Sequence, residues 1–156
     1  MKIKNLIIRG FLVVSMLVLA LFIGLTIIQF TTAEDPHFPI SMSIFAVALV
    51  LDLLALEFIV LQMNNLLTLI NQNLVFSTDS LKPVRQIKQT FFAMGIVTFG
   101  MLPFIFQGAQ ADDAPGLILF GLGVAFIPFA LSVFVSLLEQ LLQQIIAIKS
   151  ENELTI

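Results

Sequence analysis

Apolar residues fill four long stretches of the chain, and charged residues gather in the short segments between them. Residues 10–33, 89–111 and 114–138 contain no Asp, Glu, Lys or Arg, and residues 39–62 contain only Asp52 and Glu57. A helix crosses the hydrocarbon core of a bilayer with about 20 apolar residues, so each stretch is long enough to span it. The pattern predicts an all-α polytopic membrane protein, a single domain over residues 1–156, with transmembrane helices at about residues 6–28, 40–62, 90–110 and 116–138.

The second and fourth predicted helices continue past the membrane as amphipathic helices. After Gln62, polar residues such as Asn64, Thr68 and Asn71 share one helical arc. After Ser136 two opposed stripes follow, polar Glu139, Gln140, Gln143 and Gln144 against apolar Leu138, Leu141, Leu142, Ile145 and Ile148. A helix over residues 116–149 is about 50 Å long, whereas the membrane core is about 30 Å thick. We therefore expect a small cytoplasmic platform, made by the loop 64–89 and the tail 140–156.

Helix breakers separate these segments. The sequence Ser77-Thr78-Asp79-Ser80 ends the second helix and offers an N-cap for the third, whose first turn tolerates Pro83. Pro103 predicts a kink near the far end of the third helix. Within the fourth, Pro128 leaves one backbone carbonyl without its helical donor.

The positions of the basic residues predict the orientation. Lys2, Lys4 and Arg9 precede the first segment, Lys82, Arg85 and Lys88 lie between the second and third, and Lys149 follows the fourth. Basic residues mark the cytoplasmic side of a membrane protein. We therefore expect a protein of the cytoplasmic membrane with both termini in the cytoplasm. The two outer loops are then 31–39, with Glu34, Asp35 and His37, and 107–115, with Asp112 and Asp113.

Composition narrows the possible functions. A hydrophobic fraction of 59% and a charged fraction of 11% exclude an ordinary soluble domain. The chain has no Cys and one His, which excludes a disulfide, a thiolate nucleophile and a metal cluster built on Cys or His. Motifs of zinc proteases, of serine hydrolases and of phosphate-binding loops are also absent. We expect neither an enzyme nor a cofactor.

Asp52 is the most unusual residue, because a carboxylate inside a membrane segment is costly and tends to mark function. No Lys or Arg lies in a membrane segment to pair with it, and the nearest polar residues by depth are Thr98 and Ser132. It either joins helices through a hydrogen bond or forms an ion or proton site. Glu57 begins the polar arc of the second helix, where it can reach interfacial water.

The remaining charged residues offer weaker sites. Lys82, Arg85 and Lys88, spaced by three, suit anionic lipid headgroups or an acidic partner. Three charges without an aromatic platform are not a nucleic-acid footprint. Asp112 and Asp113 could bind a divalent cation, but they supply fewer than the six oxygens that calcium prefers. Capping of the fourth helix is the role that we favour for this pair, and we expect no metal.

Three stretches resemble a bacterial membrane family catalogued as domain of unknown function 2975. They are the turn 111–116 (ADDAPG), the tail 148–156 (IKSENELTI) and the central 80–88 (SLKPVRQIK). The resemblance implies a small four-helix protein of the inner membrane, with no catalytic residues. Members are often encoded beside a small helix-turn-helix regulator of the Cro/C1 type, which implies a membrane partner that holds or releases a transcription factor.

These observations favour a regulatory membrane protein, built as a four-helix bundle, whose cytoplasmic surface binds such a regulator. The expected surface comprises Asn64, Asn71, Lys82, Arg85, Lys88, Glu139, Gln143 and the tail from Glu151 through Glu153 to Ile156. The alternative is a small ion- or proton-coupled transporter or channel that uses Asp52, alone or as an oligomer. Transporters that work by alternating access are commonly built from internal repeats, and this chain has four predicted helices without an inverted repeat.

Overall fold

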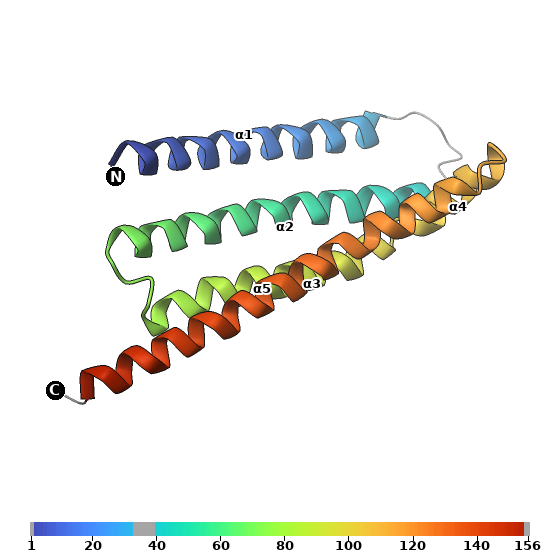
Figure 1. The fold of residues 1–156 in the computed structure, drawn as a ribbon. Helices are drawn as coiled ribbons and strands as arrows, with labels where there is room; N and C mark the ends of the chain where they lie inside the picture. The colour runs from blue at the N-terminus through green and yellow to red at the C-terminus, as the bar shows by residue number, and fades with distance from the viewer. Residues whose placement is uncertain (1, 33–39, 155–156) are drawn as a thin grey trace.

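The computed structural model describes residues 2–32 and 40–154, and every regular element in them is helical (Figure 1). The side chains of residues 2–5, 8, 11, 26, 29, 30, 32 and 152–154 are outside this description. The elements are α1 (Lys2–Thr32), α2 (Ile40–Asn71), the 3-10 turn η1 (Thr78–Ser80), α3 (Leu81–Phe99), α4 (Leu102–Ala111) and α5 (Gly116–Leu154).

Three helical segments are long and apolar enough to cross a membrane by length and composition. They are Ile40–Asn71, Thr78–Ala111 and Gly116–Glu151. In α1 the described apolar stretch is Leu12–Leu25. The architecture is therefore that of a polytopic all-α membrane protein. The fourth crossing and the cytoplasmic placement of both termini stay predictions.

The long helices pack as an open row. α1 packs on α2, α2 on α3, and α3 on α5, while α4 touches both α5 and α2. Within the described residues, α1 has no extensive packing with α3 or α5, and α2 has none with α5. Figure 1 shows α1 beyond α2, on the side away from α3. The prediction of a four-helix bundle is not confirmed, because the helices do not close around a common core.

One end of this row gathers both chain ends and the connection between α2 and α3 (Figure 1). At this end the Arg9 guanidinium on α1 donates a hydrogen bond to Thr68 Oγ1 on α2, over 3.2 Å. The beginning of α3, with Arg85 and Lys88, and the end of α5, with Lys149, lie toward the same end. We call it the basic end, and its placement in the cytoplasm stays a prediction.

The breaks in the helices follow the predicted residues with two differences. α2 ends at Asn71, and η1 leads into α3, whose first turn contains Pro83. The Ser80 side chain does not cap α3, since its hydroxyl donates to the Ser77 carbonyl. The third segment is interrupted rather than kinked, with α3 ending at Phe99 and α4 beginning at Leu102. Pro103 has no N–H for the Phe99 carbonyl, which explains the interruption there.

The tightest packing lies between α3 and α5. Gly95 on α3 is buried, and a Cβ built there would lie 2.5 Å from the ring of Phe129 on α5. That ring contacts Phe92 edge to face, with centroids 5.4 Å apart, and also Phe99 and Phe126. Small residues allow close approach of membrane helices. The contact sets the offset between α3 and α5 and so aligns the polar residues near the basic end.

Candidate functional site

Two basic residues of α3 meet one acid of α5 near the basic end. Arg85 Nε donates to Glu139 Oε1 over 3.1 Å, and Lys88 Nζ donates to Glu139 Oε2. The side chain of Glu139 is 5% exposed, whereas those of Lys88 and Arg85 are 29% and 57% exposed. The acid is thus buried beneath its two partners. A buried carboxylate that lost them would be strongly unfavourable.

Further hydrogen bonds complete this ion cluster, which we define as Arg85, Lys88 and Glu139. The Ser132 hydroxyl on α5 donates to the backbone carbonyl of Lys88, over 3.0 Å. Gln143 Nε2 donates to Glu139 Oε1 over 3.4 Å, one turn along α5. The cluster therefore ties α3 to α5 and leaves one positive charge in excess of the acid.

The ion cluster changes two sequence predictions. Glu139 was expected on the polar surface that binds a partner, but it is buried between helices. Lys82, Arg85 and Lys88 were expected to act as one basic face. Instead Arg85 and Lys88 pair with Glu139, while Lys82 lines a different site toward α2. The three cannot present a common patch, because helix packing divides them between two neighbours.

Asp52 on α2 faces α3, as predicted from its depth. Thr98 Oγ1 lies 2.8 Å from Asp52 Oδ2 and 2.8 Å from the backbone carbonyl oxygen of Met94, and both oxygens are acceptors for its hydroxyl. The hydroxyl has a single hydrogen, which these two acceptors share. The other oxygen, Oδ1, is buried and has no hydrogen-bond partner. The predicted partner Ser132 is engaged elsewhere, with the Lys88 carbonyl.

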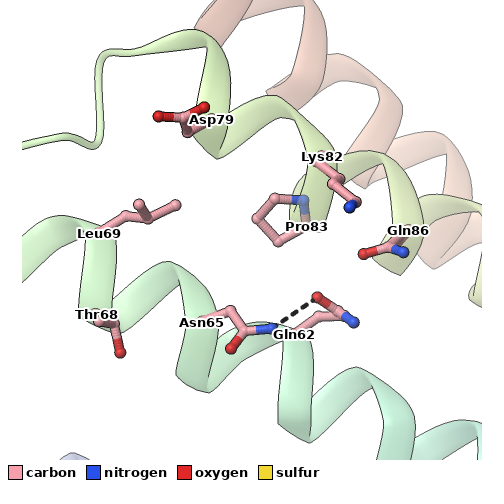
Figure 2. Close-up of a pocket in the computed structure, with 8 residues that line it drawn as sticks. All are labelled: Gln62, Asn65, Thr68, Leu69, Asp79, Lys82, Pro83 and Gln86. Carbon is pink, nitrogen blue, oxygen red and sulfur yellow. Dashed lines mark hydrogen bonds between the residues drawn. The ribbon is translucent and has the colours of Figure 1, made fainter.

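A polar groove lies between α2 and the beginning of α3 (Figure 2). Its volume is about 480 Å³, and it is lined by Gln62, Asn65, Thr68, Leu69, Asp79, Lys82, Pro83 and Gln86. In Figure 2 the side chains from α3 face those from α2 across the gap, and Asn65 donates to Gln62 Oε1 over 3.1 Å. Sequence reasoning missed Gln62 and Gln86 as site residues. The pattern that could have indicated Gln86 is its spacing of four residues from Lys82, which places both on one helical face.

The other predicted site residues are not brought together. Glu57 is half-buried on α2. Asp112 is the C-cap residue of α4 and Asp113 has a φ of 49°, so both end α4 rather than cap the fourth segment as predicted. Among the described residues no three acidic or histidine side chains cluster as a metal site. Glu151 is exposed on α5, while the side chain of Glu153 and residues 34, 35 and 37 are outside the described part.

Comparison with known proteins adds the family. Residues 26–156 match the family described as "Protein of unknown function (DUF2975)". The chain is also similar to the "Uncharacterized membrane protein YoaS" of Bacillus subtilis, with 29% identity over 143 residues, which cover 92% of this chain and 89% of that protein. No solved structure matches the chain.

Proposed function

The chain belongs to the family described as "Protein of unknown function (DUF2975)", and we propose that it is a regulatory membrane protein whose basic end binds a cytoplasmic helix-turn-helix regulator of the Cro/C1 type. The family resemblance supplies the class of partner. The geometry of α5 supplies the surface.

The observation that carries this proposal is the length and the uncovered apolar stripe of α5. The helix has 39 residues, about 58 Å at 1.5 Å per residue, against a membrane core of about 30 Å. Figure 1 shows its C-terminal part continuing past the beginning of α3. Along it, Leu138, Leu141, Ile145 and Ile148 are between 44% and 59% exposed.

The spacing of these four residues by three, four and three places them on one helical face. An amphipathic helix with such anchors binds a partner by laying its apolar face in a groove or against another helix. The polar residues beside the stripe, Gln140 and Gln144, are exposed. We call the surface formed by Leu138, Leu141, Ile145 and Ile148 the α5 stripe. Arg85 pairs with Glu139, the residue that follows Leu138 of this stripe, and its side chain is more than half exposed. Its charge favours an acidic rim on the partner.

Retention of a small helix-turn-helix regulator of the Cro/C1 type tests the proposal. The full-length protein in detergent is immobilised, and the purified regulator is passed over it. Replacing Leu141 and Ile145 together with Gln is expected to lower retention at least about tenfold, since each buried leucine or isoleucine contributes about 1.5–3 kcal/mol. A chain that ends at Ile148 is expected to bind more weakly than the full chain, because it lacks the tail.

The matched control replaces Gln140 and Gln144 with Ala on the polar side of the same turns. It should retain the regulator as the unchanged protein does, and all variants should keep their helical circular dichroism. If the full-length protein retains no regulator, or if both pairs of substitutions weaken retention equally, the proposal is wrong.

A second candidate, a small proton- or cation-coupled transporter or channel, is favoured by one observation, the buried unpaired Oδ1 of Asp52. The three cavities described along the helices are lined by other residues, and Asp52 lines none of the three. The Thr98 hydrogen bond supports instead a neutral acid that joins α2 to α3.

Asp52→Asn separates the two roles. The amide keeps an oxygen that accepts from Thr98, so we expect the free energy of unfolding to fall by no more than about 1 kcal/mol. The thermal midpoint measures this change. Thr98→Val, which removes the donor, should cost about 1–2 kcal/mol. Proton or cation uptake into vesicles of purified protein is the second measurement. Uptake by the unchanged protein that is lost in a folded Asp52→Asn variant would establish the transporter and overturn the structural role.

A further inference from the structure

The polar groove has a charge arrangement that differs from a simple basic patch. Lys82 and Asp79 both line it, one helical turn apart, and form no ion pair with each other in the described structure. Gln62 is buried within it, and Gln86 lies on the same face of α3 as Lys82 (Figure 2). The groove therefore offers a cation, a carboxylate and three amides within one small volume.

An apolar hollow continues along the same seam between α2 and α3. Its volume is about 400 Å³, and its lining includes Ile44, Leu51, Ile96 and Gly100. On α2 a single stripe, with steps of four and three, runs through residues 44, 48, 51, 55, 58, 62, 65 and 69. On α3 the corresponding stripe runs through residues 82, 86, 89, 93, 96 and 100. Such spacing keeps residues on one helical face, so groove and hollow open on the same side.

The stretch between groove and hollow suits a flexible apolar chain. Phe58 and Ala93 are exposed there, and Ala93 leaves space in the seam because its side chain is a single methyl group. From Gln62 to Leu51 the rise along α2 is about 16 Å, close to half of a membrane core of about 30 Å. An acyl chain that starts at the groove reaches the hollow near the middle of the bilayer.

We propose that the α2–α3 seam binds one zwitterionic phospholipid, with the phosphate at Lys82 and Gln86, the headgroup ammonium at Asp79 and an acyl chain along Phe58 and Ala93 to the apolar hollow. Phosphatidylethanolamine has this chemistry. An anionic lipid with an uncharged headgroup alcohol, phosphatidylglycerol, places no cation opposite Asp79, and its net charge is repelled there. Arg85 and Lys88 do not line the groove, since both bind Glu139 on α5.

Native mass spectrometry of the full-length protein tests the site, with equal amounts of phosphatidylethanolamine and phosphatidylglycerol added. We expect one phosphatidylethanolamine molecule to be retained about tenfold better than phosphatidylglycerol. Lys82→Ala should lower its retention about tenfold, as expected for loss of one charge-assisted hydrogen bond, and Lys82→Arg should keep most of it. Asp79→Asn should remove the preference between the two lipids.

Two further arms identify which part of the lipid is bound. Ala93→Leu fills the seam, so it should weaken retention of the lipid but not binding of glycerophosphoethanolamine, which has the same headgroup without acyl chains. Lys149→Ala, which removes an exposed cation of α5 that does not line the groove, is the matched control and should leave the retention of the lipid unchanged.

The inference is overturned if both lipids are retained equally by the unchanged protein, or if Lys82→Ala behaves as Lys149→Ala does. Competition by inorganic phosphate as strong as that by glycerophosphoethanolamine would show a site for free phosphate instead. Because no regulator is present in this experiment, its outcome is independent of the partner proposed above.

Discussion

Replacing Glu139 with Ala is expected to destabilise the protein by about 2–3 kcal/mol, the largest loss that we expect from a single polar residue. The change removes the acceptor for Arg85 and Lys88 and leaves two cations against each other at the interface of α3 and α5. Breaking a fully buried ion pair costs about 3–5 kcal/mol. Arg85 is more than half exposed, so water screens part of this loss.

Thermal unfolding followed by circular dichroism measures the effect, since the chain has no Trp or Tyr for fluorescence. Gln140→Ala, at the exposed neighbouring position, is the control and should leave the midpoint nearly unchanged. Exchanging the charges, with Lys88→Glu and Glu139→Lys together, should recover part of the stability that Glu139→Lys alone loses. A Glu139→Ala protein as stable as the Gln140→Ala control would contradict the role assigned to the ion cluster.

Gly95→Ala is expected to destabilise the protein by about 1–3 kcal/mol, the range for overpacking a filled interior. The added methyl would lie 2.5 to 2.7 Å from three atoms of the Phe129 ring. The ring cannot easily turn away, because Phe92, Phe99 and Phe126 surround it. The helix itself would gain about 1 kcal/mol from Ala over Gly. A net loss of stability would therefore show that the clash with Phe129 outweighs this gain.

Gly123→Ala provides the matched control within α5, where an added Cβ meets no atom within 4 Å. There the gain in helix propensity stands alone, so stability should stay level or rise. Combining Gly95→Ala with Phe129→Leu should recover much of the loss, because the smaller side chain makes room. If both glycine variants changed the thermal midpoint by the same amount and in the same direction, the close contact between α3 and α5 would not be present.

The candidate site could be predicted only in part. Thr98 was one of two candidate partners of Asp52, because depths follow from counting residues along the helices, and the hydrogen bond confirms this candidate. Ser132 lies at a similar depth, yet it faces the Lys88 carbonyl. Depth alone does not decide which residues meet, because the rotation of each helix about its axis also matters.

Glu139 shows the same limit more strongly. Its neighbours Gln140, Gln143 and Gln144 suggested a solvated polar face, and those three residues are exposed. Glu139 itself is buried because α3 lies against that edge of the helix and provides two cations at the matching height. A polar face in one helix carries no information about a charged neighbour that is 54 residues away in the chain.

Properties of single segments could be read from the chain before any fold was known. The helical class, the segments long enough to cross a membrane, the breaks before Leu81 and near Pro103, and the extension of α5 all depend on local length, hydrophobicity and backbone chemistry. The open row, the ion cluster and the polar groove depend instead on how helices rotate and slide against one another. That choice is made by packing between distant residues, such as Gly95 against Phe129, which no hydrophobic pattern encodes.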